Sequence, residues 1–462
     1  MRRYSHGSFR LPNPYPTMSP KKVLIIGINY SPELTGIGKY TGEFGASLVR
    51  CGHHVDVVTT NPWYPQWKTG PGSGSGRFRI EDVAGVRVIR CPLYVPSLPT
   101  PIRRILQDLS FFLTSFLAVT ALLLRGHRYD IVHTVMPSFL SGFVACWYRF
   151  WHRKASLVMH IMDLQIDAAE ALGMIRARWL LVLLKKSEAY LLGKADVVST
   201  ISIGMLQRLQ SKPVRYRKLL LLPNWVDMDC IHPRIPDQKI LRDLGIPTDR
   251  KIVLYSGAIG EKQGVDALVD VSRQAFSVMP HLHFVISGSG PYYEALMRQA
   301  SLQGIVNLQF IPLQPVDVYN QLLNHAWLHL VIQRDTRSEL FLPSKLANIW
   351  AVGGLALVTA EPGSHLFQLV QEQRAGQLVS DCGADRLFDA ITLLDREPEQ
   401  GKSLQSNALA YVHRNLDRSK VIRQYLLESG LFDPDIQGRI LPSPAAMGQR
   451  QLPGRKQAEA RA

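Results

Sequence analysis

Cysteine is scarce in this 462-residue chain, and the few cysteines are scattered. They stand at positions Cys51, Cys91, Cys146, Cys230 and Cys382, with no CxxC pair and no spacing typical of metal ligands. Cysteines placed in this way are usually small core residues rather than ligands. We therefore expect a protein of a reducing compartment, the cytoplasm.

Apolar runs long enough to cross a bilayer are also lacking. The candidate segment Leu109–Leu124 has sixteen residues without a charge, fewer than the roughly 18–20 that a span requires. Residues 1–20 are polar and rich in proline, without the apolar core of a secretory signal. The sequence therefore predicts neither export nor a true membrane span.

Acidic residues are few in the first half of the chain. Residues 1–225 hold 29 Lys and Arg against 12 Asp and Glu, whereas residues 226–462 hold 24 against 25. The basic excess lies beside apolar and aromatic sequence in three segments: Leu109–Leu124, Trp147–Lys154 and Arg176–Lys194. This combination favours a face that rests on an anionic membrane surface, with ordinary core helices as the alternative.

The segment Val23–Thr59 has the pattern of a strand, a loop, a helix and a second strand. Val23–Ile28 is a short apolar run typical of a strand buried on both faces. A helix is expected from about Lys39 to Cys51, after a loop that contains Gly36 and Gly38. These two glycines lack the third glycine of a dinucleotide fingerprint, so a nicotinamide site is the weaker interpretation.

The same alternation returns in the second half. Lys251–Ser256 is expected to be a buried strand that leads into a glycine loop and a helix over Val265–Ser277. A strand at Leu282–Ile286, a turn at Ser287–Pro291 and a further helix and strand follow. Two such halves predict an α/β protein with two Rossmann-like, doubly wound domains that face a cleft.

Five blocks of sequence resemble the retaining glycosyltransferases of family GT4, and most closely the colanic-acid and exopolysaccharide branch. The blocks are Gly27–Glu43, Arg90–Pro96, Pro223–Trp225, Tyr255–Gly264 and Leu342–Lys345, in the order that the branch has them. The resemblance covers roughly residues 22–430 and implies the GT-B fold. The expected division is a disordered extension (1–20), an acceptor-side domain (21–224), a linker (225–233), a nucleotide-sugar domain (234–415), a returning helix (416–432) and a disordered tail (433–462). Whether Met1 or Met18 is the start stays open.

The resemblance implies the donor-binding residues. Cations and backbone amides stabilise the charge that develops on the leaving diphosphate. The expected set is Gly36, Gly38, Gly257, Gly260, Lys262, Gly288, Ser344, Lys345 and Asn348. Ala258 replaces an arginine of the family, and Lys262 stands one place early, with a surface lysine at a helix start as the alternative.

The resemblance also implies three catalytic residues. His160 and Asp163 fall at the C-terminal end of the strand expected at Leu157–Ile161, where open α/β sheets usually place their ligand-binding residues. The family carries two glutamates eight positions apart, but here these positions are Leu340 and Asn348, and the adjacent Glu339 is the candidate for the donor sugar. For His160, the alternative is a core histidine with its hydrogen bonds satisfied. No metal is expected, because the Asp227-Met-Asp229 sequence lies in the linker rather than in a metal-binding loop.

The resemblance implies a transferase that needs neither a bound cofactor nor a metal and that uses a GDP- or UDP-linked sugar, with fucose as one candidate.

 The expected acceptor is a polyprenyl-diphosphate-linked glycan, at the cytoplasmic face of the cell membrane. Two alternatives from other classes remain open, a non-catalytic scaffold of a polysaccharide assembly complex and a GT-B nucleotide-sugar epimerase or phosphorylase. A nucleic-acid-binding protein is disfavoured, because no recognition helix or RNA-binding motif accompanies the basic charge.

Overall fold

The computed structural model describes residues 19–33, 36–64, 67–69, 76–98, 100–171, 173–175, 177–334 and 343–432, without the side chains of Ala171 and Lys262. The chain forms two compact units. Unit 1 comprises the chain up to Ser199, residues 209–221 and the chain from Gln424 onward, and unit 2 comprises residues 200–208 and 222–423. The expected disordered segments fall almost wholly outside the described residues.

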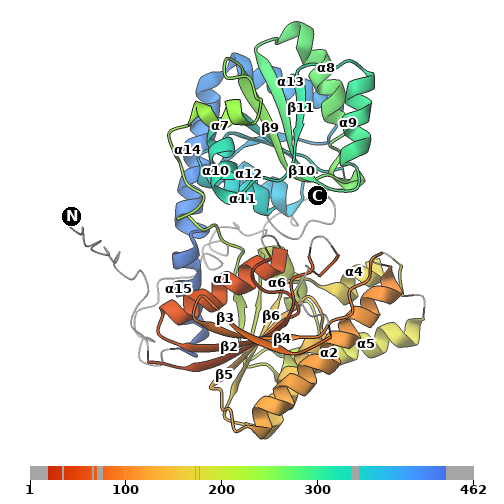
Figure 1. Ribbon diagram of the computed structural model, residues 1–462, viewed down its shortest axis with the longest axis vertical. Coiled ribbons are helices and arrows are strands. Elements are labelled where there is room, and N and C mark those ends of the chain that lie inside the picture. Colours follow the sequence, from red (N-terminus) through yellow and green to blue (C-terminus); the bar gives the residue numbers. More distant parts are fainter. Residues whose placement is uncertain are drawn as a thin grey trace, which may run out of the picture. The chain divides into compact units, whose positions relative to one another are not determined.

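Unit 1 is built on an eight-stranded sheet in the order β3-β4-β2-β1-β5-β6-β7-β8 (Figure 1). Strand β1 pairs in parallel with β2 and β5, whereas β3 forms an antiparallel hairpin with β4. Its strands are β1 (Lys22–Ile26), β2 (His54–Thr60), β3 (Arg79–Val83), β4 (Val86–Cys91), β5 (Ile131–Met136), β6 (Ser156–Ile161), β7 (Val197–Thr200) and β8 (Leu219–Leu221). The helices of this unit are α1 (Gly36–Arg50), α2 (Pro101–Leu124), α3 (Leu140–Trp151), α4 (Gln165–Ala171) and α5 (Arg178–Lys194). Helix α6 (Ile203–Gln210), which follows β7, belongs mostly to unit 2.

Helix α1 begins earlier than the sequence predicted. It starts at Gly36 rather than near Lys39, so that Gly36 and Gly38 lie in its first turn and not in a preceding loop. Gly36 has a φ of 65°, which is a conformation that glycine adopts without strain. A Cβ on Gly38 would lie 2.3 Å from Oε2 of Glu33, so this glycine lets the segment after β1 pack on the helix.

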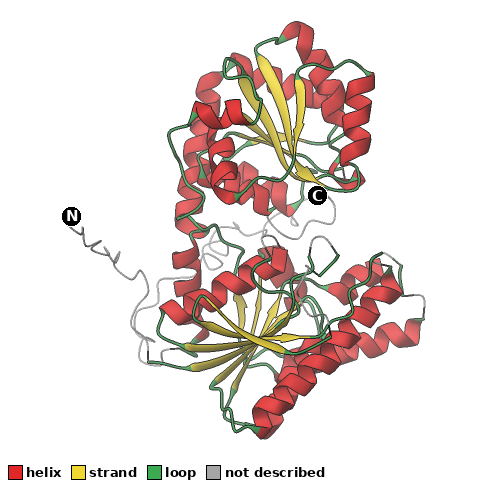
Figure 2. Ribbon diagram, viewed as in Figure 1, coloured by secondary structure: helices red, strands yellow, loops and turns green. Residues whose placement is uncertain are grey.

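Unit 2 is built on a six-stranded parallel sheet in the order β11-β10-β9-β12-β13-β14, with helices on its faces (Figure 2). Its strands are β9 (Lys251–Ala258), β10 (Leu282–Ser289), β11 (Leu308–Ile311), β12 (Ala326–Val331), β13 (Ala356–Thr359) and β14 (Gln377–Val379). Its helices are α7 (Gln238–Asp243), η1 (Glu261–Gln263), α8 (Ala267–Val278), α9 (Tyr293–Leu302), α10 (Val316–His325), α11 (Ser344–Ala351), α12 (His365–Gln373), α13 (Ala384–Arg396) and α14 (Pro398–Asn415). Two buried clusters of apolar side chains fill the two faces of this sheet.

The turn predicted at Ser287–Pro291 is partly wrong. Strand β10 continues to Ser289, and Gly288 therefore lies in the strand beside Gly257 of β9. A Cβ on Gly288 would lie 2.0 Å from the carbonyl oxygen of Gly257, a distance that no side chain tolerates. Glycine is required there because the two backbones approach closely.

The last described helix, α15 (Arg418–Ser429), ends in unit 1. The hydroxyl of Tyr425 lies 3.2 Å from Oγ of Ser199, and its ring packs edge-on against Phe44. The ammonium group of Lys218 donates hydrogen bonds to the carbonyl oxygens of Glu428 and Ser429. These contacts attach the C-terminal part of the helix to the unit that contains the N-terminal strands.

Candidate active site

Lys345 lies at the carboxyl edge of the sheet in unit 2. It is the second residue of α11, and its ammonium nitrogen lies 4.6 Å from the centre of the Tyr255 ring. Its Cδ would lie 3.7 Å from a Cβ built on Gly257. The fold thus brings together Gly257, at the end of β9, and Lys345, which is far away in the sequence.

Asn348 stands one turn further along α11 and belongs to a small polar network. Its side chain hydrogen-bonds to Tyr319 of α10, whose hydroxyl lies 3.4 Å from Oγ of Ser256 on β9. Burial raises the pKa of Tyr319, which keeps its phenol neutral. The network positions Asn348, but the role predicted for it toward a ribose stays a prediction.

Of the other predicted donor-side residues, Gly260 and Ser344 lie near the same edge, whereas Gly36 and Gly38 belong to α1 of unit 1. Gly260 is the residue before η1, and Lys262 lies within that turn, although its side chain is outside the described residues. Ser344 is exposed at the start of α11. Glu339, the candidate for the donor sugar, falls outside the described residues.

In unit 1, Asp163 follows β6 and is exposed at the carboxyl edge of the sheet. Partial desolvation raises the pKa of its carboxyl group, while a hydrogen bond from the Leu164 amide and the positive charge of Arg104 act in the opposite direction. A pocket beside it is lined by Met136, Pro137, Phe139, Ile161, Asp163, Gln165, Ile166, Glu188, Leu192 and Leu209. A carboxylate at this position can accept a hydrogen bond from a substrate hydroxyl.

His160 is placed differently from Asp163. His160 is 6% exposed, and its Nδ1 lies 3.0 Å from Oγ of Ser199. Burial lowers the pKa of His160 to about 4, so the ring is neutral at pH 7. This placement fits the alternative of a core histidine better than that of a proton donor, and the catalytic role of His160 stays a prediction.

Sequence reasoning missed two charged residues near Asp163. Asp108 of α2 hydrogen-bonds to Ser138, which follows β5, and burial raises the pKa of Asp108 to about 6. Arg104, one turn earlier, lies with its guanidinium carbon 5.1 Å from the centre of the Trp67 ring. In the sequence, only the spacing of four residues indicated that Arg104 and Asp108 share one side of a helix. The structure adds that this side of the helix lies against the edge of the sheet.

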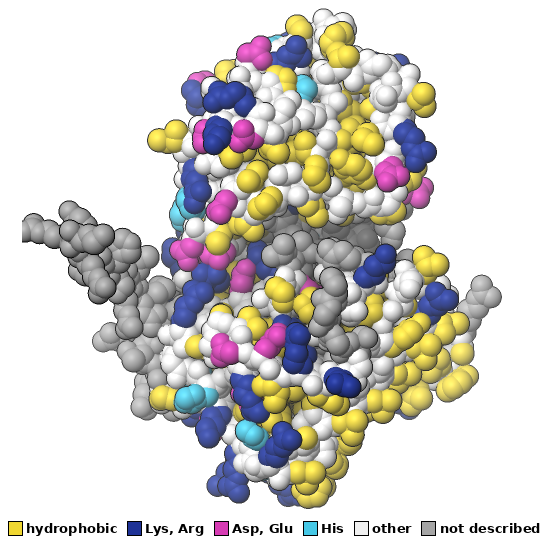
Figure 3. All heavy atoms as spheres, in the orientation of Figure 1, with side chains coloured by type: hydrophobic (Ala, Val, Ile, Leu, Met, Phe, Trp, Pro, Cys, Tyr) yellow, Lys and Arg dark blue, Asp and Glu magenta, His cyan; other side chains and the backbone are white. Residues whose placement is uncertain are grey.

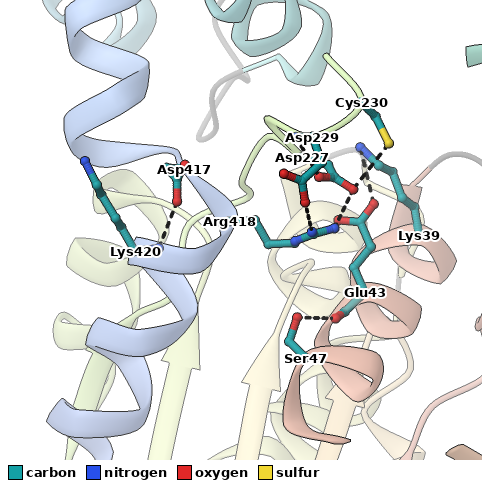
Figure 4. Close-up of polar contacts among 9 residues, drawn as sticks. All are labelled: Lys39, Glu43, Ser47, Asp227, Asp229, Cys230, Asp417, Arg418 and Lys420. Carbon is teal, nitrogen blue, oxygen red and sulfur yellow. Dashed lines mark hydrogen bonds and ion pairs between the residues drawn. The ribbon is translucent and has the colours of Figure 1, made fainter. Parts of the chain in front are cut away.

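The linker aspartates have a structural partner. Arg418 is 6% exposed and forms ion pairs with Asp227 and, at 3.0 Å, with Asp229 (Figure 4). The backbone is joined at the same place, because Val226 donates a hydrogen bond to Leu416 and accepts one from Arg418. The Asp-Met-Asp sequence therefore serves to bind an arginine.

Comparison with known proteins identifies the family. Residues 35–225 match the model of the glycosyl transferase 4-like domain, and residues 236–410 match that of glycosyl transferases group 1. The chain is 36% identical over 412 residues to the putative colanic acid biosynthesis glycosyl transferase WcaI of Escherichia coli, covering 88% of this chain and 98% of that protein. The chain is a GT-B glycosyltransferase of this family.

Solved structures agree with this fold. The glycosyltransferase matches the sucrose-phosphate synthase of Thermosynechococcus elongatus with a TM-score of 0.65 and 19% identity, over 88% of this chain and 97% of the other. It matches Anabaena HepE, solved in complex with UDP and glucose, with a TM-score of 0.61 and 15% identity, over 88% and 99%. The prediction of a GT-B glycosyltransferase is thereby confirmed.

Proposed function

We propose that this glycosyltransferase moves a hexose-type sugar, with retention of its anomeric configuration, from a nucleoside diphosphate to a polyprenyl-diphosphate-linked glycan. The pathway is of the colanic-acid or exopolysaccharide type, since the Escherichia coli relative carries that name. The observation that carries the proposal is the position of Lys345 beside Gly257 at the carboxyl edge of unit 2.

The chemistry of the donor side supports this proposal. Departure of the diphosphate places negative charge at a site where a half-buried ammonium group can stabilise it. The ring of Tyr255 lies beneath this ammonium group and attracts it through a cation–π interaction. Burial raises the pKa of Tyr255, so its phenol is neutral and does not replace the phosphate as the partner of the ammonium group. The leaving phosphate would accept the proton of the acceptor hydroxyl in a front-face reaction.

Relatives indicate the range of donors. Anabaena HepE was solved with UDP-glucose, and a Mycobacterium tuberculosis relative that is 24% identical over 397 residues is named a GDP-mannose-dependent phosphatidylinositol monomannoside mannosyltransferase. Both UDP- and GDP-linked sugars are therefore candidates, with GDP-fucose among them. The second relative also acts on a lipid acceptor, by its name.

The surface of unit 1 supports a lipid-linked acceptor. Helix α2 has 24 residues and is long and apolar enough to cross a membrane, by length and composition alone. One face, with Phe111 and Val119, is buried, whereas Leu113 and Leu117 are 59% and 58% exposed. A helix with one face packed on its own domain and the other exposed is suited to lie on a membrane rather than to cross it.

This surface continues onto two neighbouring helices. Exposed apolar or aromatic side chains gather over α2 and α5, at the lower right of Figure 3. They include Ile102, Ile105, Leu106, Leu109, Leu113, Leu117, Phe150, Trp151, Trp179, Val182 and Leu183, which we call the apolar face. The exposed cations Arg153 and Lys154 lie just after α3, where anionic lipid would attract them.

The test of the proposal is transfer by the purified full chain. Thermal shifts with GDP and UDP identify the base, because a ligand that binds only the native state raises its stability. Transfer is then measured with GDP-fucose, GDP-mannose, UDP-glucose and UDP-galactose on a bacterial lipid extract. Lys345→Ala is expected to lower transfer by roughly 10²–10³-fold, the scale of one lost transition-state donor.

Lys239→Ala is the matched control, because Lys239 is also the second residue of a helix and is exposed. Wild-type transfer by the Lys345→Ala protein would contradict the donor assignment. A protein that shows no nucleotide binding and no transfer would favour the non-catalytic scaffold. Donor conversion without transfer to lipid would favour the epimerase or phosphorylase.

A further inference from the structure

The first two turns of α2 carry a pair of charged residues, Arg104 and Asp108. Arg104 and Asp108 are four residues apart and therefore lie on the same side of the helix. Asp108 hydrogen-bonds to Ser138, directly after β5, and Arg104 lies over the ring of Trp67, in the segment after β2. Since β2 and β5 flank β1 in the sheet, the pair lies at the point where the strand order reverses.

A second carboxylate joins this pair. Asp163 follows β6, the strand next to β5, and its carboxyl group interacts electrostatically with Arg104. Asp108 is half-buried, and burial raises its pKa to about 6, whereas Asp163 beside it is exposed and the pKa of its carboxyl group is raised by a partial loss of water. A half-buried carboxylate is costly while it has few hydrogen-bond partners and is stabilised when further donors bind.

The charges select the chemistry of the ligand. Arg104 interacts electrostatically with both carboxylates and lies over the Trp67 ring, so a phosphate would meet two negative charges and one cation that is already engaged. Hydroxyl groups, in contrast, can donate hydrogen bonds to both carboxylates. Tyr64, which is 39% exposed and follows β2, offers an aromatic surface at the same edge.

We infer that Arg104, Asp108 and Asp163 form a binding site for an uncharged sugar ring of the acceptor, with Asp108 accepting a hydrogen bond from a ring hydroxyl. This inference deepens the proposed function by naming a subsite for the acceptor. The diphosphate of the acceptor lies outside this subsite. Asp108 is thereby an acceptor-binding residue rather than a group that reacts.

Helix α2 also relates this subsite to the apolar face. Ile105 and Leu106, which lie between Arg104 and Asp108 in the sequence, are 58% and 49% exposed. The same two turns of the helix thus present the polar pair to the sheet edge and aliphatic side chains to the outside. A sugar held at Asp108 lies close to the surface on which a polyprenyl chain would rest.

The experiment measures sugar binding without any donor. Saturation transfer from the full-length protein to ring protons is recorded for the methyl glycosides of glucose, galactose, mannose and fucose, which have no alkyl chain for the apolar face. At least one glycoside is expected to bind. Asp108→Asn, which keeps an oxygen for the Ser138 hydroxyl, is expected to weaken that binding by about tenfold, the scale for a hydrogen bond to a charged group.

Glu294→Gln is the matched control, because Glu294 also belongs to an Arg–carboxylate pair at a spacing of four, exposed on α9. Binding that Asp108→Asn weakens, that Glu294→Gln leaves unchanged and that millimolar pyrophosphate does not displace supports the inference. Asp163→Asn, at an exposed position, gives the same test if the Asp108 variant does not fold.

Three results would overturn the inference: no transfer to the ring protons of any glycoside, equal binding by the Asp108→Asn and wild-type proteins, or displacement by pyrophosphate. These results are distinguishable from failure of the proposed function, because no nucleotide sugar enters the measurement. If the wild-type protein transfers sugar and the Asp108→Asn protein still binds glycosides equally well, only the assignment of Asp108 to the acceptor is wrong.

Discussion

Replacement of Leu113 and Leu117 by aspartate is the sharpest perturbation of the apolar face. Both side chains are more than half exposed on α2, so the change leaves the packed side of the helix intact. Transfer of a whole leucine side chain from water is worth about 1.5–3 kcal/mol, and the exposed part of these two therefore contributes about 2–4 kcal/mol together. Repulsion of two new carboxylates by anionic lipid adds about 1 kcal/mol each.

The sum predicts that binding to vesicles falls by at least about 100-fold, since each 1.4 kcal/mol is a factor of ten. The assay is co-sedimentation with vesicles that contain phosphatidylglycerol, at low salt and at 1 M NaCl. The wild-type protein should stay largely bound in high salt, because the apolar contribution is insensitive to screening, and should be released by alkaline carbonate or mild detergent.

Two controls separate the membrane surface from general effects. Aspartate at Leu302 and Leu313, which are 89% and 54% exposed in unit 2, should leave vesicle binding unchanged. Aspartate at Phe111, which is 1% exposed, should unfold the protein instead of releasing it, because this ring faces the core. Wild-type protein that ignores anionic vesicles, or a Leu113/Leu117 variant that binds them equally well, would refute the reasoning.

Three further predictions concern stability and metal. Arg418→Met should lower the free energy of unfolding, measured by urea titration, by up to about 3–5 kcal/mol, because it leaves the largely buried carboxylate of Asp227 without its partner. Asp229→Asn, at an 84% exposed side chain, should change this free energy little. Gly38→Ala should lower the melting temperature because its methyl group would collide with Glu33, whereas Gly193→Ala, where no atom lies within 4 Å, should not; equal temperatures would contradict the packing role. Transfer should survive excess EDTA, and loss that Mn²⁺ or Mg²⁺ restores would show that a metal takes part.

The sequence predicted the alternation of strands and helices well, because burial on both faces leaves a local signature. The runs at Val23–Ile28 and Lys251–Ser256 correspond to β1 and β9, which are central in their sheets. It predicted less well where helices begin and which way they face. The apolar run Leu109–Leu124 is only part of α2, and its composition cannot tell that Phe111 is buried and Leu113 exposed.

The candidate site divides in the same way. Sequence alone determined the family, the two-domain α/β plan and the positions of Asp163 and Lys345 at strand and helix ends, because motifs and periodicity are local properties of the chain. Only the tertiary structure decided that Asp108 meets Ser138 and that His160 bonds to Ser199. It also decided that the linker aspartates pair with Arg418. These residues are distant in sequence, and their pKa values and burial depend on which segments the fold places against them.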